Sequence, residues 1–433
     1  MSPTAIGITG LAALVVLIFT RIPIGFLMAM IGFVGFAAIV NTNAALTLLA
    51  KDFVSVFTSY NLTVIPLFVL MGQIAFHAGI SRRLFDAAYR LIGHWPGGLA
   101  VAAVGACAGF AAICGSTNAT AATMATTCLP EMKRYNYDPG LACGVVSAAG
   151  SLGILIPPSV IFIVYGILTE QSIGRLFIAG ILPGILLSLI FVAVILIWAR
   201  VRPDIGPRGP RTTWVQRLKA ISGVGETLVL FVVVMGGLIF GLFTPTEAGA
   251  VGAFGALFIA GMRRTITLRQ VKESLFETTR ITCMIMVIVA GATIFGHFLA
   301  VSRIPYDIAT FVMGFNLPSW IVMAMIVMVY IAGGCFIDSL ALIMLTVPIF
   351  FPVVVQLGYD PIWFGVIIVM VTQIGVITPP VGVNVYVVHG VARDVPLHVI
   401  FKGALPLLAA LVFATLLLIP FPQIALFLPS MLR

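Results

Sequence analysis

The stretch SLGILIPPSV at residues 151–160 has a counterpart in QIGVITPPVG at residues 373–382, with one glycine and two prolines in the same places. The two stretches are 222 residues apart, and other features of the sequence keep that spacing. They are the pairs Pro23 and Pro245, Pro96 and Pro318, Pro130 and Pro352, and Tyr137-Asp138-Pro139 and Tyr359-Asp360-Pro361. A constant spacing of this kind predicts a chain built from two copies of one unit.

The composition predicts a polytopic membrane protein. Of the 433 residues, 61% are hydrophobic and 9% are charged, and the mean hydropathy is +1.19. Soluble domains carry about 25% charged residues, so a soluble globular protein is excluded. The length leaves room for about 10 to 14 membrane segments. The net charge of +9 is attributed to cytoplasmic loops, and no nucleic-acid partner is expected.

Apolar segments predict ten crossings and two re-entrant hairpins. The crossings fall at 4–20, 23–40, 61–79, 141–166, 176–199, 224–243, 246–262, 281–300, 361–388 and 403–425. The stretches 97–132 and 319–351 are interrupted by small and polar residues, so each is predicted to enter the membrane and return. Each copy then has five spanning helices and one hairpin, and an odd number of crossings inverts the second copy. The predicted fold class is therefore an all-α polytopic membrane protein with two inverted-topology repeats, residues 1–199 and 223–433.

The distribution of basic residues sets the expected orientation. The equivalent segments 41–60 and 263–282 carry one and five Lys or Arg residues. With 263–282 inside, 19 of the 23 basic residues are cytoplasmic, and the remaining four are Lys51, Arg175, Arg303 and Arg433. The positive-inside rule then places both termini outside and makes the basic stretch 200–222 a cytoplasmic linker. Segments 43–59 and 263–280 are expected to lie along the interface as arms, or else to be ordinary loop helices.

The chemistry is expected where the membrane helices break. Broken backbone is tolerated within a bilayer only where it is buried in protein or lines a cavity. The hairpin tips GSTNAT (115–120) and GGCFID (333–338) offer hydroxyls, an amide and a carboxylate, and the Pro-Pro breaks leave carbonyls without helical partners. Such oxygens suit a small alkali cation, and half-helix N-termini suit an anion. The sequence thus predicts one cation site and half an anion site in each repeat.

Other residues narrow the function. Asp338 is the carboxylate clearly inside a predicted membrane segment, which makes it a ligand candidate. Glu247 in the Thr244-Pro-Thr-Glu stretch is predicted to close a capping box. No protease, hydrolase or ATP-binding motif occurs, so the chain is not expected to be an enzyme. No Lys or Arg is predicted beside the breaks, and this favours symport of an anion with a cation.

The same motifs resemble the large subunit of the tripartite ATP-independent periplasmic (TRAP) transporters, the DctM family. The resemblance runs nearly end to end and is carried by GSTNATAAT (115–123), GILIPPSVIFIVYG (153–166), FIAGILPG (177–184), FTPTEAGAVGA (243–253) and GVITPPVGVN (375–384). It implies a sodium-coupled importer of organic acids that works by an elevator movement in the bacterial inner membrane, with both termini periplasmic. It also implies a small four-helix membrane subunit (Q), here a separate chain, and a periplasmic substrate-binding protein as partners.

The resemblance also implies where sodium and substrate bind. The first sodium site would use Ser116, Asn118, Gly153, Ile156 and Pro158. The second would use Gly333, Cys335, Gly375, Thr378 and Val381, with Cys335 contributing its backbone oxygen because a thiol is a soft ligand. Substrate is expected at Gly115, Thr117, Asp338, Pro157, Pro379 and Asn384. Sodium is the only metal expected, and no cofactor is expected. The alternative function is a self-sufficient sodium-coupled anion symporter that works without a binding protein.

Overall fold

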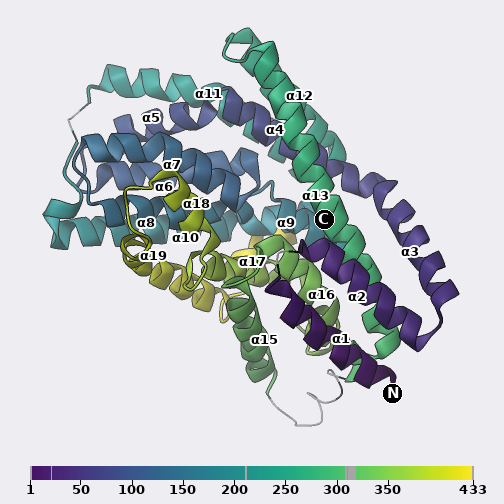
Figure 1. Cartoon of the computed structure of the whole chain (residues 1–433). Helices are drawn as coiled ribbons and strands as arrows, with labels where there is room; N and C mark the ends of the chain where they lie inside the picture. The colour runs from purple at the N-terminus through teal and green to yellow at the C-terminus, as the bar shows by residue number, and fades with distance from the viewer. Residues whose placement is uncertain (1, 21, 210–211, 308–309, 311–317, 432–433) are drawn as a thin grey trace.

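The structure is a computed structural model that describes residues 2–20, 22–209, 212–307, 310 and 318–431, and within these residues it contains helices and no strands (Figure 1). The predicted all-α fold is confirmed. Arg21, Arg211 and Arg433, which entered the expected charge balance, lie outside the described residues. The first half comprises α1 (Pro3–Ile18), α2 (Ile24–Ile39), α3 (Thr42–Phe57), η1 (Tyr60–Thr63), α4 (Val64–His77), α5 (Ile80–Ile92), α6 (Gly98–Cys114), α7 (Thr117–Arg134), α8 (Pro139–Gly150), η2 (Ser151–Ile154), α9 (Val160–Thr169) and α10 (Ile173–Val201).

The second half keeps the register of the first. It comprises η3 (Pro203–Ile205), α11 (Trp214–Ile239), α12 (Pro245–Met262), α13 (Leu268–Ser302), α15 (Ser319–Gly334), α16 (Ser339–Gln356), α17 (Pro361–Ile377), α18 (Val383–Val391), α19 (Leu397–Leu418) and α20 (Gln423–Ser430). Both ends of α16 lie 222 residues after those of α7. Helix α17 similarly matches α8 with η2, and α18 matches α9. The peptide bonds Pro157–Pro158 and Pro379–Pro380 are both cis.

The repeated Tyr-Asp-Pro element starts a helix in each half. The Oδ1 atom of Asp138 accepts a hydrogen bond from the backbone N–H of Leu141 at 2.9 Å, at the N-terminus of α8. Asp360 accepts from the N–H groups of Ile362 and Trp363 at 2.8 and 3.0 Å, at the N-terminus of α17. The following proline takes the first helical position, where no backbone donor is needed. The element is thus a local helix start, and this explains its recurrence.

Seven described helical segments are long and apolar enough to cross a membrane, fewer than the ten crossings predicted. They are 60–77, 173–201, 214–239, 245–262, 268–302, 339–356 and 397–418. The predicted crossings 4–20 and 23–40 correspond to α1 and α2, which have 16 residues each. The predicted crossings 141–166 and 361–388 are divided by their Pro-Pro breaks into shorter helices. Six of the seven segments match predicted crossings, and the four missing crossings are these short or broken helices. The seventh segment is α16 (339–356), which was predicted as the second arm of the hairpin 319–351.

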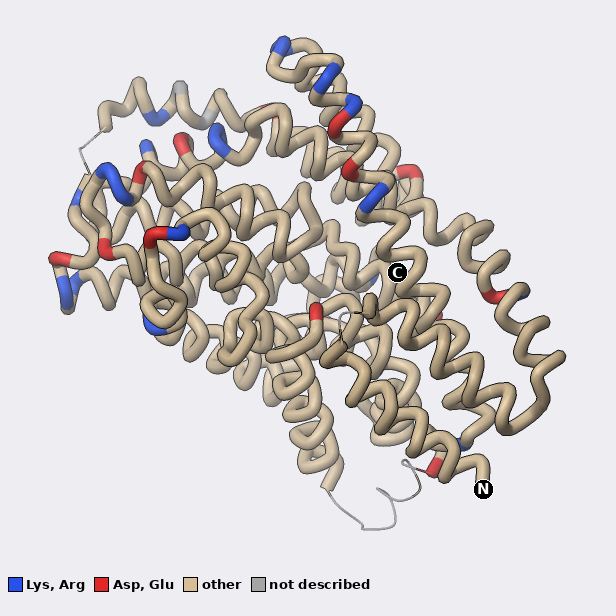
Figure 2. Tube along the Cα trace, in the orientation of Figure 1, with Lys and Arg blue, Asp and Glu red and all other residues tan. Residues whose placement is uncertain are grey.

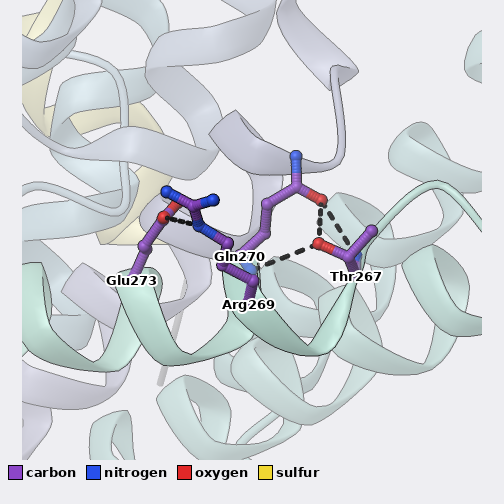
Figure 3. Close-up of polar contacts among 4 residues, drawn as sticks. All are labelled: Thr267, Arg269, Gln270 and Glu273. Carbon is purple, nitrogen blue, oxygen red and sulfur yellow. Dashed lines mark hydrogen bonds and ion pairs between the residues drawn. The ribbon is translucent and has the colours of Figure 1, made fainter.

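The second arm is continuous with a spanning helix. Residues 263–280 and 281–300 were predicted as separate segments, but the structure has one 35-residue helix, α13. Figure 3 shows its start, where the Thr267 N–H donates to Gln270 Oε1 at 2.9 Å and the Gln270 N–H donates to Thr267 Oγ1 at 3.3 Å. An ion pair of 3.0 Å between Arg269 and Glu273 follows one turn later. In the first half, α3 and α4 are separated by the turn that contains η1.

A second capping box starts α12 and confirms the role predicted for Glu247. The Thr244 N–H donates to Glu247 Oε2 at 2.8 Å, and the Glu247 N–H donates to Thr244 Oγ1 at 3.3 Å. Pro245 occupies the first turn, where its missing N–H has no cost. This carboxylate is therefore used in helix initiation.

The helices form two groups that meet near the centre of the molecule (Figure 1). In one group α2 packs along α13 and α4 packs along α12. In the other, the hairpin α6–α7 packs on α8, and α19 packs on α8 as well. Helix α5 lies between them, because it contacts α6 and also α11. It was not among the predicted elements.

The linker between the halves is anchored to helix ends. The N–H of Gly97, at the start of α6, donates to the Gly206 carbonyl at 2.9 Å, and the Gly209 N–H donates to the Gly93 carbonyl at 2.9 Å. The Tyr137 hydroxyl donates to the Pro207 carbonyl at 2.9 Å and accepts from the Leu99 N–H at 3.1 Å. Burial raises the pKa of Tyr137 to about 12, so its hydroxyl stays neutral. The linker therefore runs over the ends of α5 and α6 in a fixed path.

Basic residues gather along the top and left of the molecule in the view of Figure 2, near the ends of α5, α7 and α10, along α11 and at the turn between α12 and α13. Few lie near the N-terminus, at the lower right of the same view. A one-sided distribution of this kind is typical of membrane proteins.

Candidate functional site

A cavity of about 740 Å³ lies where the two helix groups meet. Its volume falls within the range of small-molecule sites, about 300 to 1,000 Å³. One wall consists of residues from α2, α4 and the 281–288 part of α13. The opposite wall consists of the two hairpin tips, at Cys114–Ala119 and Asp338–Ala341, with residues that follow the two breaks. The cavity therefore brings together the segments in which the sequence places the chemistry.

Four helix N-termini reach this cavity. The first residues of α7 and α16, at the hairpin tips, line it. Val160 and Val383 also line it, and they are the first residues of α9 and α18 after the two breaks. The first N–H groups of a helix have no partner within the helix, and the end carries a positive partial charge. Four such ends, two from each repeat, therefore direct partial positive charge toward the cavity, and its described lining residues include no basic side chain.

Side-chain charge in the cavity is confined to one carboxylate. The described residues lining it include no Lys, Arg or His, and the polar side chains are Gln73, Ser116, Thr117, Asn118, Asp338 and Ser339. The Asp338 carboxylate accepts from the Leu340 N–H at 3.1 Å as the N-cap of α16, and Asn118 of the other tip lines the same cavity. At the equivalent position of α7 the cap is the neutral Ser116, whose Oγ accepts from Ala119 at 3.4 Å. The α16 end is therefore already matched by a negative charge, whereas the α7 end is not.

The first tip depends on a glycine. Gly115 has φ of +66°, and a Cβ atom there would lie 2.8 Å from the Pro158 carbonyl oxygen. The Gly115 carbonyl in turn accepts from the Val160 N–H at 3.4 Å. Tip and break are therefore in direct backbone contact, and this contact leaves no room for a side chain.

Oxygen atoms converge where the first break meets α7. A Cβ on Gly153 would overlap the Ser116 carbonyl oxygen and would lie 2.7 Å from the hydroxyl oxygen of Thr120. That hydroxyl is buried without a hydrogen-bond partner among the described groups. Ser116 and Gly153 of the expected first sodium site are thus adjacent, and Thr120 joins them. Ile156 turns its side chain toward Gly184 of α10, so only its backbone is left for a ligand.

The second expected sodium site has a different geometry. Gly375 approaches Gly334, so closely that a Cβ on Gly375 would overlap the Gly334 backbone. The Gly333 carbonyl already accepts from the N–H groups of Phe336 and Ile337, at 3.0 and 2.9 Å. The Cys335 thiol donates to the Ile331 carbonyl at 3.2 Å, and the Thr378 hydroxyl donates to the Ile374 carbonyl at 2.5 Å. Tip and break are thus brought together here too, but several of the expected ligand groups are engaged in local hydrogen bonds.

The residues expected to bind substrate separate into three that line the cavity and three that do not. Gly115, Thr117 and Asp338 line it. Asn384 lies directly behind it, where its Oδ1 accepts from the Thr117 hydroxyl at 2.8 Å and its Nδ2 donates to the Ser147 carbonyl at 3.1 Å. Pro157 is buried and Pro379 is exposed, and neither is in the lining. Asn384 therefore contacts Thr117 and not the cavity itself.

Several lining residues were not predicted. Gln73 interrupts the apolar α4, and a single amide in a predicted span was an available signal. Pro23–Phe26 of α2 and the 281–288 part of α13 are apolar. They carry no local signal, because only the packing of the two helix groups brings them to the tips. Ser339 follows the second tip directly and could have been included with it.

A polytopic helical fold of two repeated halves, with a polar cavity between hairpin tips, is typical of a membrane transport protein. Comparisons with known proteins give the family. The sequence model of the family described as "Tripartite ATP-independent periplasmic transporter, DctM component" matches residues 11–424. The chain belongs to this family, and it is a multi-pass membrane permease and not an enzyme.

Its relatives cover nearly the whole chain. It is 41% identical over 374 residues to the C4-dicarboxylate TRAP transporter large permease protein DctM of Pseudomonas aeruginosa, covering 86% of this chain and 87% of that protein. It is 33% identical over 417 residues to the sialic acid TRAP transporter large permease protein SiaM of Vibrio cholerae, covering 96% of each. Among solved structures, the Alcanivorax borkumensis YdaH transporter matches with a TM-score of 0.62 at 15% identity, over 88% of this chain and 90% of that one, which indicates a shared fold.

Proposed function

We propose that this chain is the large membrane subunit of a sodium-coupled secondary transporter that imports an organic carboxylate. A periplasmic binding protein delivers the carboxylate, and the hairpins carry it across the membrane by an elevator movement. The observation that carries the proposal is the convergence of four helix N-termini on one cavity without a basic side chain among the described lining residues. N–H groups at such ends are suited to carboxylate oxygens.

Sodium coupling is supported by the oxygen atoms near the first break. The Ser116 carbonyl and the unpartnered, fully buried Thr120 hydroxyl face Gly153, and they are hard neutral ligands of the kind that suit an alkali cation. Asp338 adds a negative charge in the cavity, which Ser116 also lines. A bound cation would also reduce the repulsion between Asp338 and an anionic substrate. Cation and anion are therefore expected to bind together.

An elevator movement is supported by the division of the cavity walls. The tips and breaks form one wall and belong to the α6–α8 and α15–α18 group, whereas α2, α4 and α13 form the other. A substrate bound at the tips would travel with the first group past the second. We propose that the second group is the static scaffold, that it contacts a small Q-type subunit, and that the termini are periplasmic.

One relative, an isethionate permease named DctMQ from Oleidesulfovibrio alaskensis, is 35% identical over 373 residues, and the match covers 85% of this chain and 58% of that protein.

The proposed class of substrate is supported by the cavity and by two of the relatives. Relatives are named for C4-dicarboxylates and for sialic acid, and both compounds carry carboxylates. The relative that is 41% identical is named for C4-dicarboxylates, so succinate is the first probe.

The proposal is tested by transport in proteoliposomes. The chain is purified gently from its native membrane, and co-purifying proteins are identified by mass spectrometry. A small membrane protein with about four spans is expected. After reconstitution, uptake of radiolabelled succinate and radiolabelled sialic acid is measured with an inward sodium or potassium gradient, with and without the soluble periplasmic fraction of the source organism. Uptake of one of them that requires both sodium and that fraction is the expected result.

Each other outcome contradicts a stated part of the proposal. Sodium-driven uptake without the periplasmic fraction favours the self-sufficient symporter. Uptake that is equal in sodium and potassium contradicts sodium coupling. Purified chain that binds or transports no carboxylate under any of these conditions contradicts the reading of the cavity as an anion site.

A further inference from the structure

The two repeats are joined at their equivalent points by a buried polar contact. The Oγ atom of Ser151 in η2 and the Oε1 atom of Gln373 in α17 lie 3.2 Å apart, and the two residues are separated by 222 positions, the spacing of the repeat. Both side chains are fully buried. Ser151 therefore meets its own counterpart at the centre of the molecule. A polar pair at such a depth is costly unless it is hydrogen-bonded.

The available hydrogen atoms decide which residue of the Ser151–Gln373 pair is the donor. The Ser151 hydroxyl is 2.7 Å from the Ala148 carbonyl, and its single hydrogen is used there. The same hydroxyl cannot fully donate to Gln373 Oε1 as well. Gln373 Nε2 has no partner among the described groups. Turning the amide by 180° lets Nε2 donate to Ser151 Oγ. Gln373 is then the donor, Ser151 relays the bond to Ala148, and Oε1 becomes a buried acceptor beside the breaks.

The pair is close in sequence to both expected cation sites. Ser151 precedes Gly153, which approaches the Ser116 carbonyl of the first tip. Gln373 precedes Gly375, which approaches the Gly334 backbone of the second tip. In each half the separation is two residues, within a helical turn. A shift of either break on binding a cation would therefore move one partner of the Ser151–Gln373 bond.

We propose that the Ser151–Gln373 hydrogen bond couples the two cation sites, so that sodium binding at one break positions the other. The two residues are positioning residues and ligate no ion. The inference rests on the proposed sodium coupling, and it adds a second sodium site at the break that contains Gly375. The bond links the two repeats directly, so no chain of intermediate contacts is needed. Coupling of this kind is reciprocal and changes affinity by about 5-fold to 150-fold.

The test measures equilibrium binding of radiolabelled sodium to the purified chain in detergent, with choline as the replacement cation. The wild type is expected to bind sodium with a Hill coefficient clearly above 1 and at most about 2. Ser151→Ala and Gln373→Met are expected to lower the coefficient to about 1 and raise half-saturating sodium by about 5-fold or more. The amount of sodium bound at saturation stays the same, because no ligand is lost. The double variant is expected to match the single variants.

Thr372→Val is the matched control. Thr372 is the fully buried neighbour of Gln373 on α17, and its hydroxyl donates to the Val369 carbonyl of its own helix at 2.8 Å. This variant is expected to keep the wild-type Hill coefficient. Should Gln373→Met not be recovered from membranes, Ser151→Ala decides alone, because it removes one oxygen atom and disturbs little packing.

The possible failures are distinct. Variants with the wild-type Hill coefficient and half-saturation overturn the coupling and leave the proposed function intact. A wild type with a Hill coefficient of 1 overturns the coupling as well. A wild type that binds no sodium overturns both the coupling and the sodium part of the proposed function.

Discussion

The carboxylate of Asp52 on α3 lies 2.8 Å from Nδ1 of His297 on α13, so the arm of the first repeat is tied to the long helix of the second by one polar pair. The Asp52 side chain is 7% exposed, whereas the His297 side chain is 47% exposed. A buried carboxylate without its partner would lose its hydrogen bond and remain desolvated. The pair therefore favours one docked position of α3 on α13.

Replacing His297 with alanine is expected to destabilise the protein, because Asp52 would remain buried and unpaired. The free energy of unfolding should fall by about 1 to 3 kcal/mol, measured by thermal or denaturant unfolding in detergent. The double variant Asp52→Leu, His297→Leu is expected to recover most of the loss, because both polar groups are removed together. A His297→Ala protein as stable as the wild type would show that the contact does not hold the arm.

Gly115→Ala is expected to abolish most of the uptake. The alanine Cβ would meet the Pro158 carbonyl oxygen at 2.8 Å, and the residue has φ of +66°. Because the first tip could not close on its break, uptake should fall by more than tenfold, which corresponds to about 1.4 kcal/mol or more. Gly105→Ala on α6 is the matched control, because its Cβ would have its nearest neighbour at 3.9 Å. Equal uptake by the two variants would show that transport does not depend on the close approach of Gly115 to the break.

Thr120→Val tests whether the Thr120 hydroxyl is a sodium ligand or a buried group without a function. If the Thr120 hydroxyl binds sodium, its loss raises the sodium concentration that gives half-maximal uptake by several-fold. This corresponds to the loss of a polar contact of about 1 to 2 kcal/mol. If it binds nothing, removal of an unpartnered buried oxygen leaves sodium dependence unchanged and makes the protein more stable. Thr127→Val on the same helix is the control, because that hydroxyl donates to the Thr123 carbonyl at 2.9 Å. Uptake and melting temperature together distinguish the two outcomes.

The ion pair between Lys133 and Asp394 predicts a pH-dependent contribution to stability. The two side chains are 2.6 Å apart at the ends of α7 and α18. The pair lowers the pKa of Asp394 and raises that of Lys133, in each case mainly through the hydrogen bond between them. The charged form of Asp394 stabilises the folded protein, and this stabilisation is lost as the pH falls through the lowered pKa of Asp394. The charged form of Lys133 does the same, and its stabilisation is lost as the pH rises through the raised pKa of Lys133.

The difference in melting temperature between wild type and Lys133→Met is therefore expected between about pH 4 and pH 10 and should vanish outside that range. The expected size is small, because both groups are exposed. Melting curves collected across this range check the prediction. A difference that is constant with pH would assign the effect of the substitution to packing.

Much of the fold was predictable because it is specified by local sequence features. Prolines and glycines restrict the backbone wherever they occur, so the repeat, the helix starts at Asp138 and Asp360, and the tip at Gly115 could be located from the sequence. The predicted tips and breaks also provide one wall of the cavity. Contacts between distant segments could not be obtained in this way. The Thr117–Asn384 hydrogen bond joins residues 267 positions apart, and no local pattern specifies it.

The unpredicted features share a physical reason. The cavity wall from α2, α4 and α13 is largely apolar, and apolar residues look the same whether they face lipid, a neighbouring helix or a ligand. The amphipathic pattern of Leu268 to Leu275 indicated a helix but did not reveal that it continues into the next span without a turn. Helix continuity at that point depends on the absence of a glycine or proline, which is a weaker signal than their presence.

The unbroken α13 has a consequence for the surrounding bilayer. Its 35 residues extend about 52 Å at 1.5 Å per residue, whereas the hydrocarbon core is about 30 Å thick. The surplus must be accommodated by tilt or by lying in the headgroup region. Because no turn separates the two parts, we expect a thinner bilayer that tilts the span to reorient residues 268–280 as well, whereas in the first half the turn that contains η1 can absorb a tilt of α4. The two halves of the protein are therefore expected to respond differently to acyl-chain length.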